Sequence, residues 1–463
     1  MTGTVRIDGL ATDVCLPPAP GPHPAVVVRT PYDRRHHRAE LRGWAARGFA
    51  ALAQDVRGRH ASDGDWDPYG DQEAKDGETT LRWIREQPWS DGTVVASGAS
   101  YAAYCALVAP GADAVIAAVP ALGLAETARE ATGPERLLAR AGWWSEHGGT
   151  PHARAGRLDQ LPVLGILDSP AWAALWRAGP RPVPAADVPL LAVGGTRDPF
   201  AADTLRLWRH WPGPARLLLG PWGHRLTAEP APEARPAHRL NLGALHTGWA
   251  RAALAGRLTG RASAVALGGS DHWCRLPDPV LTPYPFGTPT GPRPLRGADF
   301  VADPARPVRS DRLDVPEHGV PDRCLLVTPP LPRPLDLLGP AEARLDAVAD
   351  APSADWAVRL VALDPAGRAD PLATGIVRRT DPGPFTVPLG HLARRLAAGT
   401  RLRVEVAGHH FPAHARNPHT GEDPVTATRL LPSRRTVRMR SSALRLPVVR
   451  GVHPLDPVQE IQT

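Results

Sequence analysis

The fold is decided by the stretch Thr93-Val94-Val95-Ala96-Ser97-Gly98-Ala99-Ser100-Tyr101-Ala102. Its apolar first part predicts a buried strand, and residues 104–108 continue in a helical pattern. Small residues stand two positions before and after Ser100, at the spacing of the Gly-x-Ser-x-Gly turn, with Ala102 in place of the second glycine. Such a sharp strand-to-helix turn strains the serine and leaves no room for larger neighbours. We predict that Ser100 is a nucleophile, although the motif alone is a weak signal.

Two further polar residues follow apolar runs downstream of Ser100. Residues 188–193 lead to Asp198, and residues 215–219 lead to His224. If both runs are parallel strands, all three side chains emerge at the sheet edge where ligands bind. A serine hydroxyl needs an imidazole to remove its proton, and the imidazole needs an acceptor that fixes its tautomer. We therefore assign the attack to Ser100, general base and then acid catalysis to His224, and orientation of the imidazole to Asp198.

The alternation of strands and helices predicts an α/β fold for the N-terminal part of the chain. Strand-like runs that alternate with helical patterns build a parallel sheet with helices on both faces. The runs are residues 25–29, 49–54, 93–96 and 114–119, and a helical pattern covers residues 73–86. Together with the order Ser, Asp, His, this alternation predicts an α/β-hydrolase fold.

Two regions break the alternation. Residues 125–185 lack strand-like runs, which predicts a helical cap inserted over the active edge of the sheet. After about residue 290, short segments of period two between Pro, Gly and Asp turns predict an all-β sandwich. The expected organisation is a hydrolase core at 1–124 and 186–256, the cap at 125–185, a linker at 257–290 and the sandwich at 291–463.

Four tryptophans are candidate walls of an apolar substrate pocket. Trp143, Trp144 and Trp172 lie in the expected cap, and Trp222 lies close to His224. Substrate pockets are commonly lined by aromatic side chains. The alternative is that the cap tryptophans only pack the cap onto the core.

Several segments stand in an order that is typical of a known family. They are Arg29-Thr30-Pro31-Tyr32-Asp33, Gln54-Asp55-Val56-Arg57-Gly58-Arg59, Ser62-Asp63-Gly64-Asp65-Trp66, Trp83-Ile84-Arg85-Glu86-Gln87-Pro88-Trp89-Ser90-Asp91-Gly92, Gly98-Ala99-Ser100-Tyr101 and Gly220-Pro221-Trp222-Gly223-His224. On these residues the chain resembles the cocaine esterase and X-prolyl dipeptidyl-peptidase family of serine hydrolases, also called CocE/NonD. Phe411-Pro412 and Arg416-Asn417 are similar to the C-terminal domain of the same family, so the resemblance covers most of the chain.

The resemblance implies an oxyanion hole and a C-terminal jelly roll that packs against the hydrolase domain. In this family a tyrosine hydroxyl and the backbone N–H after the nucleophile hold the tetrahedral oxygen, and Tyr32 and Tyr101 occupy those positions here. Two donors aimed at the developing negative charge stabilise the transition state. From its position alone, Tyr32 is equally well interpreted as a half-buried aromatic side chain in a loop.

Arg197 is a departure from the family pattern. Family members commonly carry an aromatic Gly-Trp-Tyr-Asp around the acid, whereas this chain has Gly195-Thr196-Arg197-Asp198. Arg197 is a candidate for binding an acidic substrate group, and the default alternative is that its guanidinium points to solvent. The segment between Ser100 and Asp198 is also short for the family's cap. Because of these two departures, we do not transfer the family's substrate preference to this chain.

Composition narrows the function classes. The 463 residues imply two or three domains, because single cores stop growing near ~250–300 residues. The net charge of +7 comes from arginines interleaved with acids, which does not suit nucleic-acid binding. No run reaches the ~18 apolar residues of a membrane span. The first residues show no apolar signal region, so a cytoplasmic location is the default expectation.

No metal and no organic cofactor is expected. The four cysteines lack the spacing of a zinc site or a disulfide framework and are expected to be reduced: Cys15, Cys105, Cys274 and Cys324. One histidine cluster lies in a loop without helical spacing, which favours structural or surface roles over metal binding: His409, His410, His414 and His419.

The expected function is a serine hydrolase that cleaves an ester or amide of a small molecule or short peptide through an acyl-enzyme on Ser100. One alternative is an acyltransferase of a biosynthetic pathway, because the same machinery passes the acyl group to an amine or alcohol when water is excluded. The other alternative is a noncatalytic binding protein whose triad has decayed. An X-prolyl exopeptidase would need carboxylates for the substrate's amine, and the loop acids Asp63, Asp65 and Asp67 are better explained as turn residues.

Overall fold

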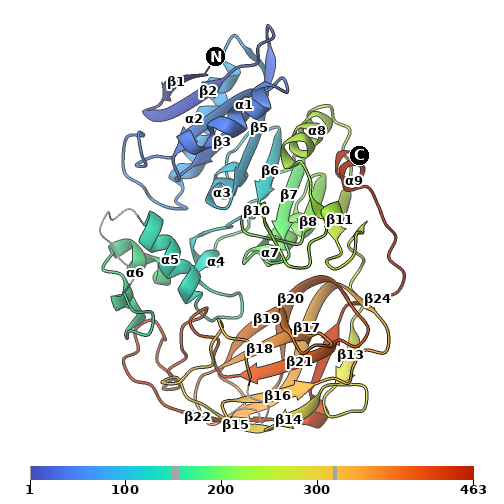
Figure 1. Ribbon diagram of the computed structural model, residues 1–463. Coiled ribbons are helices and arrows are strands. Elements are labelled where there is room, and N and C mark those ends of the chain that lie inside the picture. The colour runs from blue at the N-terminus through green and yellow to red at the C-terminus, as the bar shows by residue number, and fades with distance from the viewer. Residues whose placement is uncertain (1, 149–155, 316–320) are drawn as a thin grey trace. The chain divides into compact units, whose positions relative to one another are not determined.

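The computed structural model describes residues 2–148, 156–315 and 321–463 (Figure 1). These residues form two compact units, each assembled from segments that are distant in the sequence. Unit 1 comprises the described residues within 2–124, 181–276 and 452–463, and unit 2 comprises the described residues within 125–180 and 277–451.

Unit 1 is built on a ten-stranded sheet with the strand order β1-β2-β4-β3-β5-β6-β7-β8-β11-β12. Its strands are β1 (Thr2–Ile7), β2 (Leu10–Cys15), β3 (His23–Thr30), β4 (Ala50–Asp55), β5 (Ser90–Ala99), β6 (Ala114–Ala118), β7 (Leu190–Gly195), β8 (Ala215–Gly220), β11 (Arg261–Ala266) and β12 (Trp273–Cys274). The strands from β4 to β11 in this order run parallel to one another. Every residue of β4, β7 and β8 is buried, as in parallel sheets that are covered on both faces. The α/β fold predicted from the sequence is confirmed.

Helices and short elements complete unit 1. They are η1 (Arg34–His37), α1 (Arg38–Ala45), α2 (Gln72–Arg85), α3 (Tyr101–Leu107), α7 (Ala201–His210), β9 (Trp222–Gly223), β10 (Leu226–Pro230), η3 (Pro236–His238), α8 (Leu242–Leu254) and α9 (Pro457–Gln462). Helices α1, α8 and α9 share one buried core with the sheet, to which they contribute Trp44, Trp249 and Ile461. Burial of these large apolar side chains is the main stabilising term for this layer.

The C-terminal border of the hydrolase core differs from the expectation. Residues 257–290 were expected to be a linker, but β11 extends the sheet parallel to β8, and β12 follows it. The last residues of the chain also return to unit 1, where Glu460 of α9 binds Arg275 at 2.7 Å. The run 261–266 is only six residues long and carries no turn signal. Its pairing with the buried strand β8 therefore cannot be predicted from the local sequence pattern.

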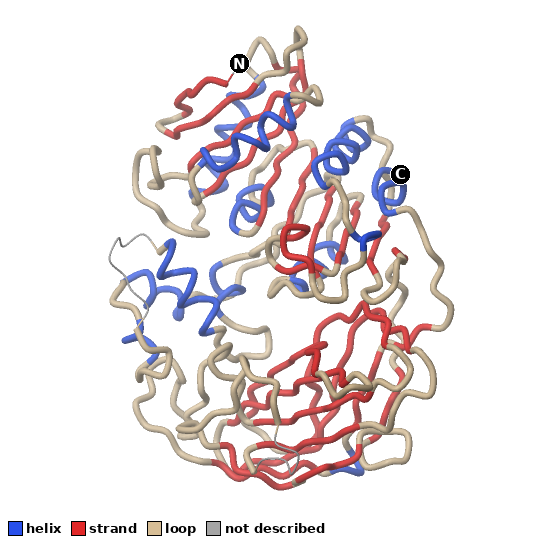
Figure 2. The backbone as a smooth tube through the Cα atoms, viewed as in Figure 1, coloured by secondary structure: helices blue, strands red, loops and turns tan. Residues whose placement is uncertain are grey.

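Unit 2 combines a helical segment with a β-sandwich (Figure 2). The helical elements are α4 (Leu124–Ala128), α5 (Leu137–His147), η2 (Val163–Ile166), α6 (Pro170–Arg177) and η4 (Met439–Ser441). The strands are β13 (Thr282–Pro285), β14 (Arg293–Arg296), β15 (Asp299–Ala302), β16 (Arg323–Val327), β17 (Leu335–Ala349), β18 (Ala354–Leu363), β19 (Ala369–Arg379), β20 (Gly383–Leu396), β21 (Arg401–Ala407), β22 (Ser433–Val437), β23 (Ala443–Leu446) and β24 (Val448–Val449). The expected all-β C-terminal domain is confirmed.

The two sheets of the sandwich enclose a single core. A seven-stranded sheet has the order β13-β23-β17-β22-β15, with β20 and β24 also paired to β17, and a five-stranded sheet has the order β14-β16-β21-β18-β19. Leu345 of β17 and Trp356 of β18 belong to the same cluster of buried apolar side chains. Such a layer between two antiparallel sheets is the typical core of a β-sandwich.

Polar contacts explain why the helical segment belongs to unit 2. Glu135, which precedes α5, binds the guanidinium of Arg378 in β19 through both carboxylate oxygens at 2.9 and 2.8 Å. The same guanidinium also binds Asp355 of β18. The backbone N–H of Leu164 donates to the carbonyl of Val425 at 3.2 Å. The helices expected at 125–185 are therefore tied to the sandwich by buried ion pairs and backbone bonds.

Buried histidines occupy the loop that follows β21. The Nδ1 of His419 lies 2.8 Å from the carbonyl oxygen of Leu431, and its Nε2 accepts from the Arg435 guanidinium at 2.8 Å. The His409 ring stacks on His419 with a centroid distance of 5.1 Å. Burial, together with the charge of Arg435, lowers the pKa of His419 to about 4. These contacts give both histidines structural roles.

The His419 contacts predict acid-sensitive stability. In the unfolded chain the imidazole gains a proton near its ordinary pKa of 6.5, whereas the folded side chain stays neutral until the pH reaches about 4. The stabilisation is complete above pH 6.5 and is lost as the pH falls through about 4. We expect His419 to account for up to about 3 kcal/mol of the unfolding free energy that the wild-type protein loses across this range in urea titrations. His419→Gln should lose distinctly less, and equal losses in both proteins would contradict the assignment.

Candidate active site

Ser100 stands at the strained turn between β5 and α3. Its backbone has φ 58° and ψ −119°, a conformation that residues other than glycine rarely adopt. The turn is fixed by two backbone hydrogen bonds, from the N–H of Ser100 to the carbonyl of Ala118 at 2.9 Å and from the N–H of Ala121 to the carbonyl of Ser100 at 3.2 Å. A Cβ atom on Gly98 would collide with the carbonyl oxygen of Ala102. Glycine at position 98 is thus required by close backbone packing.

Gly98→Ala is expected to damage the turn. The added methyl group meets backbone atoms, which cannot swing away as the end of a side chain can. Overpacking of this kind typically costs about 1–3 kcal/mol. We expect a lower Tm and a loss of labelling at Ser100 by a fluorophosphonate. The matched control is Ala102→Gly, which removes a methyl group on the other side of Ser100; it should keep labelling at Ser100 and lower Tm less than Gly98→Ala does. A Gly98→Ala protein with wild-type Tm and labelling would refute the steric argument.

Asp198 and His224 form a hydrogen-bonded pair. Asp198 follows β7 and His224 follows β9, and the His224 Nδ1 lies 2.7 Å from the Asp198 Oδ1. The Asp198 side chain is fully buried, whereas that of His224 is 38% exposed. The ring of Phe200 packs edge-on against the imidazole at 5.5 Å. A carboxylate at Nδ1 fixes the tautomer and leaves Nε2 for proton transfer.

The strand register puts these residues at the ends of neighbouring strands. Ala99, just before Ser100, is opposite Ala118 of β6, and Ala118 is opposite Val193 of β7. Gly195 of β7 is in turn opposite Gly220 of β8. The carboxyl ends of β5, β7 and β8 therefore lie along one edge, as the sequence analysis expected. Proton transfer between the Ser100 hydroxyl and His224 stays a prediction.

Tyr101 places its side chain in the core below the turn. Its hydroxyl donates to the Glu73 Oε1 at 2.7 Å and accepts from the backbone N–H of Tyr69 at 3.0 Å and the Trp66 Nε1 at 3.3 Å. Burial and the nearby Glu73 raise the pKa of Tyr101 well above its usual value, so the hydroxyl remains a donor. Glu73 also binds Arg29 at 3.0 Å. The oxyanion role predicted for Tyr101 concerns its backbone N–H, which lies in the first turn of α3.

The loop that carries Tyr32 is held by neighbouring side chains. The carbonyl of Pro31 accepts from the Arg59 Nε at 3.2 Å and lies 2.9 Å from the His60 Nε2. The Arg59 guanidinium stands 4.4 Å from the centre of the Trp66 ring. Burial lowers the pKa of Arg59, and the nearby Tyr101 and Tyr32 side chains oppose this shift in part. Tyr32 is half-buried, and its role as second oxyanion donor remains a prediction.

Arg197 forms an ion pair that the sequence did not predict. Its Nε donates to the Oε1 of Glu233 at 2.8 Å, and the two side chains are only 22% and 4% exposed. The guanidinium is therefore paired with a carboxylate instead of being simply solvated, and its role in binding an acidic substrate group stays a prediction. A buried carboxylate needs such a cation, because an isolated charge in a dry environment is very unfavourable. The local pattern around Arg197 gives no signal for this partner, which lies 36 positions after Arg197 in the chain.

Two of the four candidate tryptophans are packing residues. Trp222 is 1% exposed and packs against Trp273 in the core of unit 1, with ring centres 6.1 Å apart. Trp172 is fully buried in unit 2, where its Nε1 donates to the carbonyl of Val163 at 3.1 Å. Trp144 is 2% exposed, so little of its surface is available to a ligand. Trp143 is half-buried, and a role in substrate binding stays a prediction for it.

The described residues include neither a candidate metal site nor a candidate membrane-spanning helix. In the described ranges, no group of three or more His, Cys, Asp and Glu side chains is placed to hold a metal ion. None of the helices seen in residues 2–148, 156–315 and 321–463 combines the length and apolar character needed to cross a membrane. All four cysteines are buried and free.

Family models match both parts of the chain. The model of X-Pro dipeptidyl-peptidase (S15 family) matches residues 7–161 and 140–225, and the model of the X-Pro dipeptidyl-peptidase C-terminal non-catalytic domain matches residues 288–443. Cocaine esterase from Rhodococcus sp. (strain MB1 Bresler) is 28% identical over an alignment of 532 positions, which covers 89% of this chain and 90% of that protein.

Solved structures share the architecture over nearly the whole chain. An aminopeptidase from the marine sediment archaeon Thaumarchaeota archaeon has a TM-score of 0.75 at 19% identity, covering 97% of this chain and 96% of that chain. An α-amino acid ester hydrolase has a TM-score of 0.71 at 20% identity, with the same coverage of 97% and 96%. At these identities the likeness establishes the fold.

The parallel sheet with a strained serine after β5 defines an α/β-hydrolase. The matched models and the cocaine esterase relative narrow this class further. The chain belongs to the CocE/NonD group of S15-like serine hydrolases, which is of the esterase or X-Pro dipeptidyl-peptidase type. The resemblance seen in the sequence is confirmed.

Proposed function

We propose that the chain cleaves an ester or amide bond through an acyl-enzyme on Ser100, with His224 and Asp198 completing the triad. The observation that carries the proposal is the 2.7 Å hydrogen bond between His224 and Asp198. This bond lies at the sheet edge on which the strained Ser100 also ends. An intact acid–imidazole pair argues against a binding protein with a decayed triad.

The reaction follows from the roles of these groups. The His224 Nε2 takes the Ser100 hydroxyl proton while Oγ bonds to the carbonyl carbon, and the carbonyl π electrons move to oxygen. The Tyr101 N–H and the Tyr32 hydroxyl are the proposed donors to this oxyanion. His224 then returns the proton to the leaving group as its bond to carbon breaks. Water, activated by the same imidazole, releases the acid and restores Ser100.

We favour a small ester as substrate over an X-prolyl peptide. A free substrate amine requires an available carboxylate, and Glu73 below the turn is already bound by Tyr101 and Arg29. Asp63 binds Arg6 at 3.0 Å and is 66% exposed, as a surface loop acid would be. The cocaine esterase relative, an ester hydrolase by name, agrees with this choice.

Covalent labelling tests the proposal directly. The full chain is treated with a fluorophosphonate and the modified residue is identified by peptide mass spectrometry. We expect modification at Ser100 and none in folded Ser100→Ala. Absence of label in a folded wild-type chain, or label at another residue, would reject the assignment.

A substrate panel then separates the bond types. p-Nitrophenyl esters of increasing acyl length are compared with Xaa-Pro p-nitroanilides, and we expect the esters to be cleaved with the higher kcat/KM. Adding an amine acceptor tests the acyltransferase alternative. Partition of the acyl group to the amine at low acceptor concentration would favour transfer over hydrolysis.

A further inference from the structure

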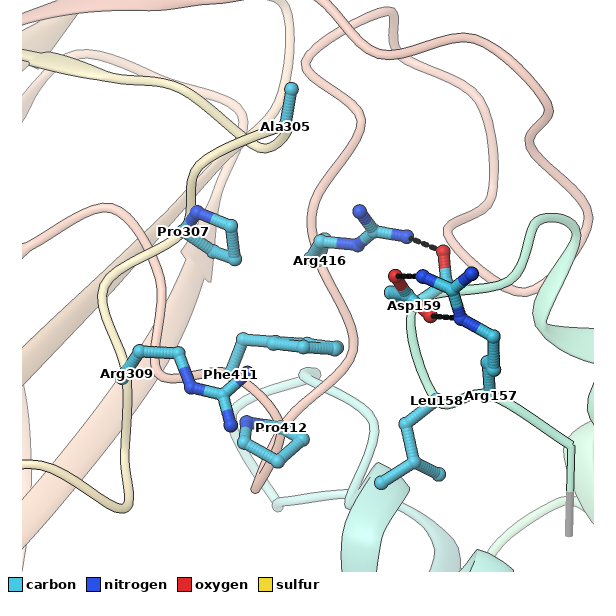
Figure 3. A pocket seen from close by; sticks show the side chains of 9 residues that line it. All are labelled: Arg157, Leu158, Asp159, Ala305, Pro307, Arg309, Phe411, Pro412 and Arg416. Atoms are coloured by element: carbon cyan, nitrogen blue, oxygen red, sulfur yellow. Dashed lines mark hydrogen bonds and ion pairs between the residues drawn. The ribbon is translucent and has the colours of Figure 1, made fainter.

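Unit 2 contains a pocket of about 440 Å³ that is separate from the residues of the proposed triad (Figure 3). Three loops form it: one between α5 and η2, one between β15 and β16, and one between β21 and β22. Its lining residues are Arg157, Leu158, Asp159, Ala305, Pro307, Arg309, Phe411, Pro412 and Arg416. The volume falls in the range of pockets that hold small organic ligands.

Positive charge dominates the lining. It holds three guanidinium groups and a single carboxylate, Asp159. Asp159 is bound by Arg157 at 2.7 Å, and Arg309 is bound by Asp311 at 2.6 Å. Within the described part of the chain, Arg416 forms no ion pair, and its partners are the backbone carbonyls of Pro304 and Asp159. The pocket therefore carries a surplus cation.

The surplus cation is also largely shielded from water. Arg416 is only 9% exposed, although buried arginines are normally paired with a carboxylate. Burial lowers the pKa of Arg416, and the nearby charge of Asp159, which is already paired with Arg157, offsets this only in part. A guanidinium offers five N–H donors, and the two carbonyl bonds leave most of them for a ligand. A carboxylate is the ligand group that this planar fork matches best.

An aromatic ring and prolines provide the apolar part of the pocket. The guanidinium carbons of Arg309 and Arg416 lie 5.4 and 5.3 Å from the centre of the Phe411 ring. Figure 3 shows Pro307 and Pro412 on either side of Phe411, with Arg157 and Leu158 on the facing loop. Such a wall suits the flat, apolar body of a small organic molecule.

We propose that this pocket binds an organic monocarboxylate, whose carboxylate pairs with Arg416 and whose apolar body lies against Phe411. Arg309 adds a second, partly exposed cation beside the same ring. The binding does not depend on the proposed triad. If the proposed ester hydrolysis also holds, the acid it releases has the chemistry of this ligand.

Phenylacetate is the test ligand, and phenylacetamide is its neutral control. Binding to the full chain is measured by equilibrium dialysis after treatment with the fluorophosphonate, so that Ser100 is blocked if it reacts. The same measurement is possible on an unreactive chain, which keeps failure of the hydrolase proposal distinguishable from failure of this one. We expect phenylacetate to bind and phenylacetamide to bind at least about ten-fold more weakly, as the loss of a charge-assisted pair implies.

Three variants sharpen the test. Arg416→Met should weaken phenylacetate binding about ten-fold or more. Arg416 also donates hydrogen bonds to two backbone carbonyls, so its replacement could disturb the loops themselves. Arg309→Met serves as a second variant that leaves these two hydrogen bonds in place. It should also weaken phenylacetate binding. Asp159→Asn removes the single lining carboxylate and frees Arg157, so it should strengthen binding.

Several outcomes would overturn the proposal. Equal binding of the acid and the amide would show that charge does not matter. Unchanged affinity in both folded Arg309→Met and Asp159→Asn would place phenylacetate elsewhere. If the chain binds sulfate but does not bind phenylacetate, the pocket is a site for inorganic anions. If the chain binds neither ligand, the pocket is a purely structural crevice.

Discussion

Replacing Ser100 with alanine is expected to lower kcat for a p-nitrophenyl ester by about a million-fold. The loss is large because alanine has no atom that can form the acyl bond, so only direct attack by water remains. The turn itself should persist, because its fixing bonds use the backbone N–H and carbonyl of residue 100. KM should change little, since the hydroxyl contributes to the transition state far more than to ground-state binding. Steady-state kinetics at saturating ester measures the effect.

Ser97→Ala is the matched control for this loss. Ser97 lies three positions before Ser100, in the strand β5 that leads to the turn, and is 5% exposed, so its replacement tests general damage to the strand. We expect its kcat to stay within a few-fold of wild type. A Ser100→Ala protein that is folded and retains more than about one per cent of kcat would mean that another nucleophile does the chemistry.

Local steric and burial patterns account for what the sequence could predict. Gly98 and Ala102 mark the turn because backbone atoms approach each other there, and any chain with this turn must meet the same constraint. The runs before Asp198 and His224 are apolar because parallel strands are covered on both faces. The fold class, the Asp198–His224 pair and the family thus follow from signals within short windows.

Contacts between residues that lie far apart in the sequence could not be predicted in the same way. Tyr101 hydrogen-bonds to Glu73 across 28 positions, and Glu73 lies in a helix whose pattern does not single it out. The bond between Arg197 and Glu233 could not be predicted, because Glu233 gives no local sign of its position. Trp222 is apolar enough to be either a pocket wall or core, and only its packing against Trp273 decides between them. A sequence indicates which side chains are buried, but which residue each of them contacts depends on how the strands assemble.

The buried contacts of Tyr101 also explain how the turn can hold its strain. A residue in the conformation of Ser100 persists only where the surroundings over-determine it. The Tyr101 hydroxyl ties the start of α3 to α2 through Glu73 and to the loop before α2 through Tyr69. The backbone N–H that we propose for the oxyanion hole is therefore fixed from below by a buried hydrogen-bond network.

Replacing Asp198 with asparagine is expected to lower kcat by about ten-thousand-fold while the protein remains folded. The carboxylate accepts from the His224 Nδ1 at 2.7 Å, which holds the proton there and leaves Nε2 ready to accept from Ser100. An amide can turn its N–H₂ group toward Nδ1, and the imidazole proton then moves to Nε2, where it faces the serine. The base is lost although the side chain has nearly the same shape. The expected signature is a fall in kcat with little change in KM.

Asp203→Asn provides the control for this substitution. Asp203 is also buried and acidic, lies in the following helix α7 and binds Arg206 at 3.1 Å, so its change tests the loss of a nearby buried charge. It should alter stability more than kcat. If Asp198→Asn lowered kcat by less than about ten-fold, or if Asp203→Asn matched its effect, the pair at 2.7 Å would be a structural contact, and the orienting group for His224 would have to be sought elsewhere.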